Sequence, residues 1–233
     1  MAGILFIISA PSGSGKSTLV SEVRRLLPGL DFSISYTTRK PRGSEENGRE
    51  YHFTSREEFE RMISANEFLE WAEVFGNYYG TALSALDLAA RHGTDLLLDI
   101  DVQGALQVMQ AMPEAVSIFI LPPSPQVLER RLRNRSQAEG STNESVIATR
   151  LSEARTELQK IDDYRYALIN DVLDQAASEM RSIVLVARGE ATPAEADLAA
   201  QCVTGARSLR LEQALESFGI IPSSNQAKLW AAT

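Results

Sequence analysis

The sequence predicts an α/β fold in which a parallel sheet is flanked by helices. Short apolar runs of strand length alternate along the chain with segments whose apolar residues recur at helical spacing. Parallel strands need a long crossover between them, which is usually a helix. The 233 residues, 44% hydrophobic and 23% charged, suit a globular domain of ordinary to large size.

The first strand and helix flank a glycine-rich segment. Ile4–Ile8 has the length and β-branched content of a buried strand, and Leu19–Leu27 has helical periodicity. Between them, Ala10–Thr18 reads Ala-Pro-Ser-Gly-Ser-Gly-Lys-Ser-Thr. A strand, a glycine-rich turn and a helix in this order predict a phosphate-binding loop, and hence a sheet of the P-loop NTPase type. Ala10 stands where the usual pattern has its first glycine, which affects how tightly the chain leaves the strand.

Each residue type in this loop has a physical role. Gly13 and Gly15 permit backbone conformations in which successive N–H groups converge on phosphate oxygens. Lys16 would reach the β- and γ-phosphates, and the Ser17 hydroxyl would bind Mg²⁺. The alternative is a chance glycine–serine turn. The loop residues expected to bind ATP are Ser12, Gly13, Ser14, Gly15, Lys16, Ser17 and Thr18.

The next segments suggest a second anion site. Phe32–Tyr36 alternates in polarity like a half-buried strand and leads into Thr37–Gly43, which contains three cations. Arg39 and Arg42 could bind a monophosphate with their guanidinium forks. The alternative is a solvated turn.

The following elements resemble a small α+β region. Ser55 to Glu58 has capping-box spacing and opens a helix. Phe68–Phe75 is expected to be a strand, Gly76–Thr81 a turn and Leu83–Ala90 a helix.

Asp95–Asp101 is an apolar strand that ends in two carboxylates, Asp99 and Asp101. In parallel sheets the carboxyl ends of the strands line the ligand crevice, so we expect these acids near the triphosphate. Asp99 could order Mg²⁺ and its water molecules. The alternative is that polar residues merely end the strand.

The second half of the chain contains a candidate lid. A helix beginning at Ser124–Pro125 runs into an arginine-rich stretch and then into the polar loop Ser136–Asn143. This pattern is typical of a lid that closes over phosphates. The alternative is a solvated charged helix. The other expected elements are the helix Gln103–Met112, the strand Val116–Leu121, the helix Val146–Ile161, the strand Tyr166–Asn170 and the helix Val172–Val186.

The character of the chain changes at Arg188. Thr192 to Glu195 forms another capping box. Leu211, Leu215 and Phe218 then form a helical apolar stripe, which must pack on the chain's own core or on another subunit. A homo-oligomer formed through this tail is therefore one expectation.

Composition narrows the classes of partner. The formal net charge of −8 argues against extended binding to nucleic acid or to an anionic membrane. No apolar run approaches the ~20 residues that span a bilayer. The single cysteine, Cys202, excludes an internal disulfide framework, so we expect a cytoplasmic protein.

Taken together, four segments resemble guanylate kinase. They are Ala10–Thr18, Ser35–Arg42, Gly76–Thr81 (Gly-Asn-Tyr-Tyr-Gly-Thr) and Leu98–Gly104 (Leu-Asp-Ile-Asp-Val-Gln-Gly). The similarity runs in order from about Ile4 to Val186. The resemblance implies transfer of the γ-phosphoryl group of ATP to GMP, with Mg²⁺ as the cofactor of ATP.

The resemblance also implies roles for individual residues. Catalytic roles fall to Lys16, Arg39, Asp99 and the lid arginines Arg131, Arg135 and Arg150. Asn170 would lie near the adenine. The GMP phosphate would be held by Arg39, Arg42, Tyr51 and Tyr79, and the guanine read by Ser35, Glu70, Thr81 and Asp101. Family members often have glycine where this chain has Ser136, which bears on the flexibility of the lid.

The implied organisation is a guanylate kinase-like domain over residues 1–187. Its core would be residues 1–34 and 82–187, with a GMP-binding subdomain at about 35–81 and a lid at about 131–150. Residues 188–233 would form a tail that contains a helix and has no assigned role.

Two other functions fit parts of this pattern. A non-catalytic guanylate-kinase-like module would bind partner proteins, but such modules typically lack an intact phosphate loop. A related kinase could act on another small phosphorylated substrate such as a ribose phosphate. Glu70, Thr81 and Asp101 together argue against it, because a sugar phosphate gives a guanine-reading site nothing to bind.

Overall fold

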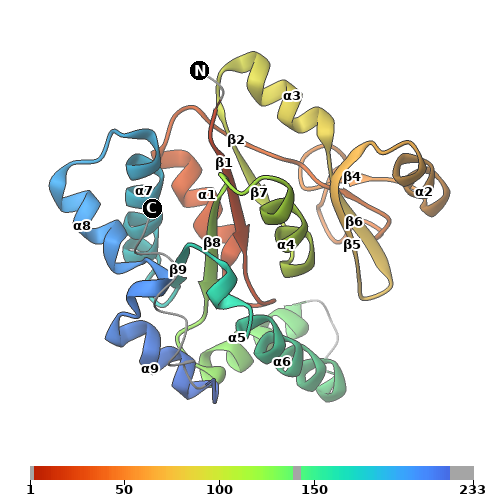
Figure 1. Cartoon of the computed structure of the whole chain (residues 1–233). Coiled ribbons are helices and arrows are strands. Elements are labelled where there is room, and N and C mark those ends of the chain that lie inside the picture. Colours follow the sequence, from red (N-terminus) through yellow and green to blue (C-terminus); the bar gives the residue numbers. More distant parts are fainter. Residues whose placement is uncertain (1–2, 139–142, 221–233) are drawn as a thin grey trace. The chain divides into compact units, whose positions relative to one another are not determined.

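A computed structural model describes residues 3–138 and 143–220, except for the side chain of residue 138. The chain forms two compact units. The first comprises Met1–Ile8 and Gly29–Val116, and the second comprises Ser9–Pro28 and Ser117–Thr233. The ribbon is shown in Figure 1. The residues 139–142 of the expected lid lie outside the described residues.

The first unit contains parallel strands flanked by helices, as the apolar runs predict. The strands lie in the order β2 (Leu30–Phe32), β7 (Asp95–Asp99) and β1 (Leu5–Ser9). Ile8 lies opposite Asp99, so the phosphate loop and the first of the two carboxylates both follow the carboxyl ends of adjacent strands. Phe6 and Leu97 are fully buried, as expected where helices cover a parallel sheet. Two helices of this unit are α3 (Leu83–His92), which precedes β7, and α4 (Val102–Ala111), which follows it.

A second, smaller sheet belongs to the same unit. Its strands lie in the order β4 (His52–Phe53), β3 (Tyr36–Thr37), β6 (Asn77–Ala82) and β5 (Phe68–Val74). Helix α2 (Arg56–Ser64) begins at Ser55, whose side chain accepts a hydrogen bond from the Glu58 N–H, as the capping-box spacing predicts.

The structure corrects two expectations in this region. Phe32–Tyr36 is not one strand: its first residue ends β2 and its last begins β3, because the chain passes from one sheet to the other in between. Gly76–Thr81 is not a turn, since Asn77–Ala82 is a strand paired with β5. Phe75 and Gly76 both have positive φ (52° and 75°) and reverse the chain in two residues, which leaves the rest of the segment free to pair.

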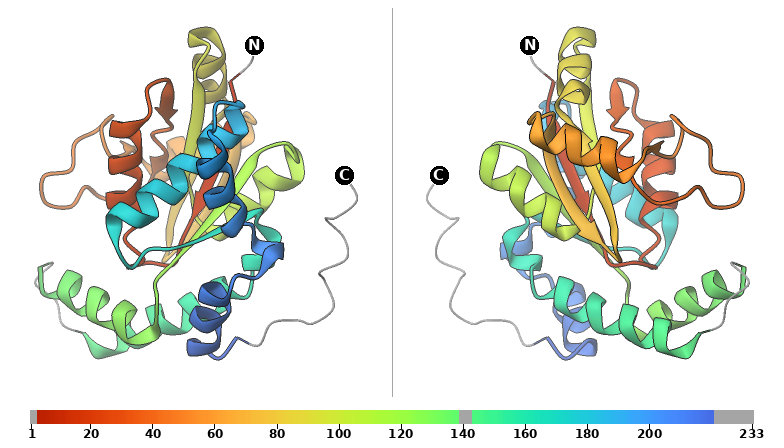
Figure 2. Two further views of the ribbon diagram at one scale, coloured as in Figure 1. Left: turned by 90° about the vertical axis from the view of Figure 1, so that its left-hand side faces the viewer. Right: turned by 90° about the vertical axis from the view of Figure 1, so that its right-hand side faces the viewer.

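The second unit holds the remaining strands and the larger helices. The strands β8 (Val116–Leu121) and β9 (Tyr166–Ile169) are parallel, and both are buried throughout. The helices are α1 (Lys16–Leu26), α5 (Pro125–Ala138), α6 (Glu144–Leu158) and α7 (Leu173–Arg188). Helix α1 packs beside α7, and α5 beside α6; the α5–α6 pair is clearest in Figure 2.

The chain beyond Arg188 folds back onto this second unit. It forms α8 (Pro193–Gln201), which packs on α7 and has the expected capping box at Thr192, then a 3₁₀ turn (Thr204–Ala206) and α9 (Leu209–Ser217). Leu211, Leu215 and Phe218 are 3%, 0% and 4% exposed, and α9 contacts β9. The chain's own core covers the apolar stripe, so the stripe gives no reason to expect a second subunit.

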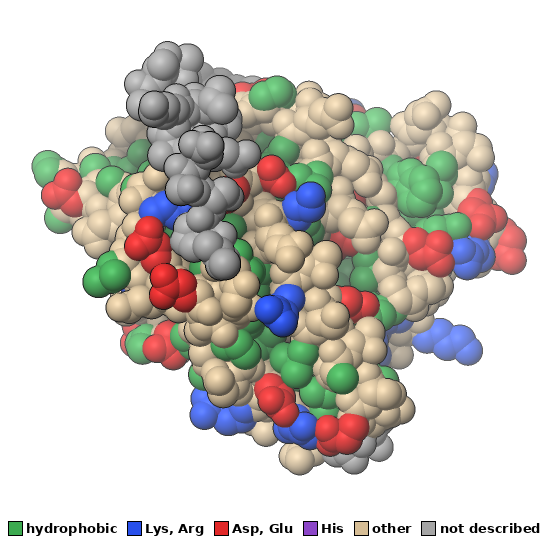
Figure 3. Space-filling view, turned by 60° about the horizontal axis from the view of Figure 1, so that its bottom comes forward, with side chains coloured by type: hydrophobic (Ala, Val, Ile, Leu, Met, Phe, Trp, Pro, Cys, Tyr) green, Lys and Arg blue, Asp and Glu red, His purple; other side chains and the backbone are tan. Residues whose placement is uncertain are grey.

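The apolar length of the helices and the distribution of surface charge bear on possible partners. None of the helices in the described ranges is long and apolar enough to cross a membrane. On the face shown in Figure 3, the basic side chains are interspersed with acidic ones.

Candidate active site

The phosphate loop in the second unit is shaped by two glycines. Gly13 and Gly15 have φ of 91° and 82°, a region that residues with a side chain rarely adopt. A Cβ atom on Gly13 would lie 3.0 Å from methyl carbons of Leu128 and Leu132, and one on Gly15 would lie 2.6 Å from Nδ2 of Asn170. Both conformation and space therefore require glycine at these positions.

The start of α1 offers an anion-binding surface. Gly15 is the N-cap residue, no side chain caps the helix, and its first turn contains no acidic residue. The N–H groups at the start of α1 and the positive end of its dipole are thus available to phosphate. Lys16 begins the helix at the rim of this cradle, and Ser17 and Thr18 are exposed.

Asn170 and Arg131 bind the backbone of the loop from two other elements. Asn170 is 5% exposed and follows β9; its Nδ2 donates to the Ser14 carbonyl over 2.8 Å. Arg131, on α5, donates from Nη1 to the same carbonyl (3.2 Å) and from Nη2 to the Asn170 carbonyl (2.9 Å). Burial lowers the pKa of Arg131. The structure thus brings two residues more than 100 positions away in the sequence against the loop.

The loop also contains groups that suit a Mg²⁺–nucleotide complex. The Ser14 hydroxyl is buried and has no hydrogen-bond partner in the described part of the chain. The exposed Ser17 hydroxyl in the first turn of α1 is a hard oxygen ligand, of the kind Mg²⁺ prefers. Mg²⁺ usually takes only one or two ligands from the protein and the rest from phosphates and water. The residues present fit such an ion.

The two other lid arginines lie on the paired helices α5 and α6. Arg135 is exposed on α5. Arg150 lies on α6, and its Nη1 is buried without a hydrogen-bond partner among the described residues. Arg133 ties the two helices together through Glu144, at 2.5 Å. Arg131 thus directly contacts the phosphate loop, through the Ser14 carbonyl.

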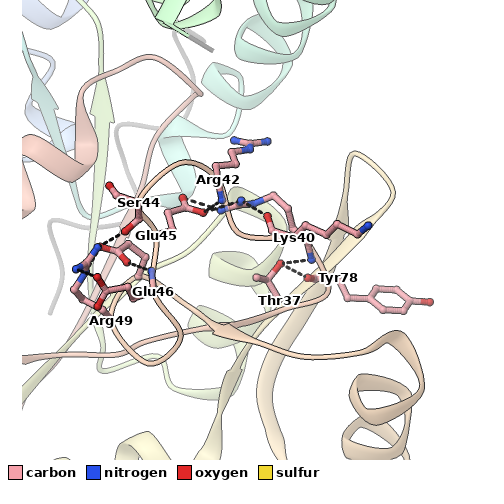
Figure 4. A network of polar contacts seen from close by, with 10 residues as sticks. Thr37, Lys40, Arg42, Ser44, Glu45, Glu46, Arg49 and Tyr78 are labelled. Atoms are coloured by element: carbon pink, nitrogen blue, oxygen red, sulfur yellow. Dashed lines mark hydrogen bonds and ion pairs between the residues drawn. The ribbon is translucent and has the colours of Figure 1, made fainter. Parts of the chain in front are cut away.

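In the first unit, Arg39 forms the centre of an anion site. It is 9% exposed, and its two terminal nitrogens donate to the two carboxylate oxygens of Glu45 over 2.9 and 3.0 Å. Burial opposes the charged form of Arg39, but the Glu45 carboxylate outweighs this and raises the pKa of Arg39. Figure 4 shows the polar network around Glu45.

Arg42 approaches the same carboxylate with its backbone. Its N–H donates to Glu45 Oε2 over 2.8 Å, whereas its guanidinium is directed away from Glu45 in Figure 4. Despite the opposing effect of burial, hydrogen bonds from Arg39 and from Arg42 N–H hold the pKa of Glu45 below its usual value. The Glu45 carboxylate thus bonds the two terminal nitrogens of Arg39, the group that the sequence predicts to bind a phosphate.

Two tyrosines lie beside this arginine. The Arg39 Cζ lies 5.3 Å from the centre of the Tyr51 ring, and the Tyr51 and Tyr79 rings meet edge to face at 5.8 Å. Burial, and then the charge of Asp99, raise the pKa of Tyr51 to about 12. Tyr51 therefore keeps its phenolic proton and can donate a hydrogen bond to an anion.

Glu70 and Asp101 converge at the N-terminus of α4. Asp101 is the N-cap residue and accepts from Gly104 N–H over 2.7 Å. A Cβ atom on Gly104 would lie only 2.2 Å from Oε2 of Glu70 and 3.3 Å from Oδ1 of Asp101. The missing side chain at Gly104 is what allows the Glu70 carboxylate to lie against the start of the helix, next to Asp101.

Burial sets the protonation of this carboxylate pair. Glu70 is 4% exposed, and burial raises its pKa to about 7; the charge of Asp101 adds to the rise, while Thr81 opposes it. Thr81 lies opposite Glu70 in the β5–β6 hairpin and is fully buried. Ser35 is buried just before β3, whose register places it level with Thr81. The residues expected to read a base therefore come from four separate segments of one unit.

Sequence reasoning missed two residues of these sites. Glu45 lies in a polar loop among other charged residues, and only the fold shows that it holds Arg39. Gly104 belongs to the segment Leu98–Gly104 that carried the family resemblance, but it was given no role of its own. A glycine at the third position of a helix, where it costs stability, was the available signal.

Known proteins resemble this chain in both sequence and structure. A family model described as guanylate kinase matches residues 3–186. A guanylate kinase of Koribacter versatilis (strain Ellin345) is 50% identical over 226 residues, which cover 94% of this chain and 97% of the relative. One of Neisseria meningitidis serogroup A is 50% identical over 186 residues, 80% of this chain and 89% of the relative. The crystal structure of guanylate kinase from Anaplasma phagocytophilum matches with a TM-score of 0.64 at 32% identity, covering 95% of this chain and 97% of that one.

Proposed function

The chain belongs to the guanylate kinase family, and from this we infer that its second unit binds ATP and its first unit binds GMP. It is a phosphotransferase that moves the γ-phosphoryl group of ATP to GMP and releases ADP and GDP. The observation that carries the assignment of the units is the separation of two anion sites. The glycine-rich cradle lies in one unit, and Arg39 with the Glu70–Asp101 pair lies in the other.

The ATP site would act by electrostatics and positioning. Phosphoryl transfer passes through a loose transition state whose charge is spread over the peripheral oxygens. The N–H groups at the start of α1 would hold the phosphates, and the Lys16 ammonium would stabilise the charge on the transferring group. Ser12, Thr18 and the buried Ser14 hydroxyl would add hydrogen bonds, and Asn170 would lie near the adenine.

The GMP site would hold its substrate at two ends. Arg39, Arg42, Tyr51 and Tyr79 would bind the phosphate, with the protonated Tyr51 donating a hydrogen bond. At the other end, guanine presents N1–H and an exocyclic amine as donors. The carboxylates of Glu70 and Asp101 are matching acceptors, while Ser35 and Thr81 hydroxyls would donate to O6.

The remaining charges would serve the group in transfer. Arg131, Arg135 and Arg150 are cations on α5 and α6, of the type that neutralises a transferring phosphoryl group. Asp99 would lie by the phosphates and Mg²⁺. No general base is required, because a phosphate acceptor is already ionised near neutral pH.

Mg²⁺ is the cofactor that this chemistry implies. Ser17 would supply a protein oxygen to it, and the ion would neutralise charge on the ATP phosphates. We further propose that the protein acts in the cytoplasm, which agrees with its free, buried Cys202.

Replacement of Lys16 by methionine tests the assignment of the ATP site. The Lys16→Met variant should lose GMP-dependent ADP formation, because the ammonium stabilises the charge of the transferring phosphoryl group. Its melting temperature should not change, because the ammonium lies at the end of a flexible stem and does not pack in the core. Lys160→Met, at an exposed lysine in the same unit, is the matched control and should turn over normally. Equal activity of the Lys16→Met variant and the parent would refute the role of the loop.

A panel of acceptors tests the assignment of the GMP site. ADP release should be measured with GMP, AMP, CMP, UMP and ribose phosphates as the second substrate. Fast turnover with GMP alone would support the proposed guanine readers. Faster turnover with a ribose phosphate would favour the related kinase, and absence of ADP release with every acceptor would favour a binding module.

A further inference from the structure

Helix α9 lies beyond residues 3–186, the part of the chain that the family model matches. It is nevertheless built into the second unit, where it packs on β9. Arg210, in the first turn of α9, is the polar residue of this helix that reaches the end of that strand.

Arg210 binds two different elements with one guanidinium. Its Nη1 lies 2.7 Å from Oε1 of Glu179, on α7, and its Nη2 donates to the backbone carbonyl of Ile169 over 3.0 Å. The Glu179 side chain is only 7% exposed and also accepts a hydrogen bond from Gln175 (2.9 Å). The planar fork of arginine suits two acceptors that diverge in this way, whereas the ammonium of lysine is a point charge.

The residue after Ile169 is Asn170, which holds the phosphate loop. The Asn170 N–H donates to the Leu121 carbonyl (2.9 Å), its Nδ2 donates to the Ser14 carbonyl, and its own carbonyl accepts from Arg131. A continuous series of hydrogen bonds and one peptide link therefore joins Arg210 to the cradle. Any shift of the Ile169 carbonyl moves the backbone that carries Asn170.

We infer that Arg210 is a positioning residue for the ATP site. It fixes the end of β9 against Glu179 of α7, and so holds Asn170 against the backbone of the phosphate loop. This inference rests on the proposed role of the loop and of Asn170 in binding ATP. It gives the segment beyond the matched residues a part in the activity.

The test is the Arg210→Lys variant of the full chain. Lysine keeps a positive charge beside Glu179 but cannot also bond the Ile169 carbonyl. Because misplacement of a substrate-holding group by a fraction of an ångström weakens its contacts, we expect the KM for ATP and the Kd for ADP to rise about tenfold. The KM for GMP, which is bound by the other unit, should change by less than about twofold. Hydrogen exchange of the Asn170 and Ser14 amides should become faster without any nucleotide present.

A matched control and a second variant complete the experiment. Arg181 of α7 pairs with Glu195 of α8 and has the same 39% side-chain exposure as Arg210. Arg181→Lys should leave both KM values and the exchange rates unchanged. If Arg210→Lys does not fold, the double variant Arg210→Met with Glu179→Gln removes both charges together and is measured in its place.

The outcomes separate this inference from the proposed function. A selective rise in the KM for ATP with faster amide exchange supports the role of Arg210. Unchanged kinetics and exchange in a folded variant overturn it, and so does an equal rise in both KM values. If the parent protein fails to bind ADP, the proposed ATP site fails, and the exchange of the Asn170 amide still decides whether Arg210 positions it.

Discussion

At the scale of single residues, Arg39 and Glu70 in the first unit differ in how their charges are compensated. Arg39 is buried and is already paired with a carboxylate, so a substrate phosphate must share it with Glu45. Glu70 is buried beside another carboxylate, with Thr81 as a hydrogen-bonding neighbour, and a ligand that carries hydrogen-bond donors would add partners to the carboxylate pair. The Arg39 charge is thus compensated before a substrate binds, whereas the carboxylate pair favours a ligand that brings hydrogen-bond donors.

The pH dependence of GMP use should reflect Glu70. Its pKa of about 7 exceeds the ordinary value, so the folded protein binds a proton there that the unfolded chain would release between pH 4.5 and 7. Below about pH 7 the Glu70 carboxyl group is protonated, so guanine has one carboxylate fewer to accept its hydrogen bonds. We expect kcat/KM for GMP to fall as the pH drops through 7, with KM for ATP little affected.

The Glu70→Gln variant is the control for this profile. It cannot ionise, so its profile should retain only the titration of the GMP phosphate, whose second pKa is about 6. Because the pKa of Glu70 is higher in the folded protein than in the unfolded chain, the free energy of unfolding should decrease as the pH rises from 4.5 to 7. Glutamine cannot ionise, so the Glu70→Gln variant should lack this pH dependence of stability. Identical profiles for the parent and the variant would show that Glu70 does not face GMP.

The carboxylate pair should also set the choice of base. Adenine has a lone pair at N1 and no amine at C2, so AMP would offer these carboxylates neither of the two donors that guanine presents. A buried polar group without a partner costs ~1–3 kcal/mol, and more when charged, so several together could discriminate by a factor on the order of a thousand. Glu70→Gln with Asp101→Asn should lower kcat/KM for GMP far more than for AMP. An unchanged ratio would mean that guanine is read elsewhere.

The Glu45→Ala variant tests whether Glu45 helps or hinders the binding of GMP. Glu45→Ala should raise the KM for GMP by up to about thirtyfold, because an unrestrained arginine must lose side-chain entropy worth ~2 kcal/mol on binding. Glu50→Ala, at another acidic residue of the same loop that pairs with Arg49, should have little effect. A lower KM for GMP in Glu45→Ala would show instead that Glu45 competes with the substrate phosphate.

At the scale of elements, α9 stabilises the second unit through one face only. Leu215 is fully buried, whereas Leu209 at the start of the same helix is 69% exposed. Leu215→Ala should reduce the free energy of unfolding by about 2–5 kcal/mol, since it removes buried methyl groups and leaves a cavity. Leu209→Ala should change it by less than about 0.5 kcal/mol. Thermal unfolding of the two variants is the measurement, and equal melting temperatures would contradict the packing of α9.

At the scale of the whole molecule, the main residues of each proposed substrate site belong to one unit. The phosphate loop, Asn170 and Arg131 belong to the second, and Arg39, Glu70 and Asp101 to the first. Binding of the two nucleotides should therefore be separable. By calorimetry, Lys16→Met should still bind GMP, and the double variant Glu70→Gln, Asp101→Asn should still bind ADP. Loss of both affinities in either variant would mean that the sites are not independent.

The sequence by itself determined the parallel α/β fold and the phosphate loop. Apolar runs of strand length, helical periodicity and the order of strand, Gly13, Gly15, Lys16 and helix are local properties, because each is set by backbone geometry over a few residues. The capping residues Ser55 and Thr192 were predictable for the same reason. Local patterns also singled out Arg39 and Asp101. The family resemblance then added Glu70 and assigned all three to one substrate.

Only the tertiary structure decided what depends on contacts between distant segments. The split of Phe32–Tyr36 between two sheets follows from competition between pairing partners, and alternation of polarity cannot show which partner wins. Glu45 and Gly104 gain their roles only when Arg39 and Glu70 are brought beside them. The apolar stripe of α9 could have faced solvent, a second subunit or the chain's own core. Packing against β9 settled this, because burial depends on which surface lies opposite and not on the helix alone.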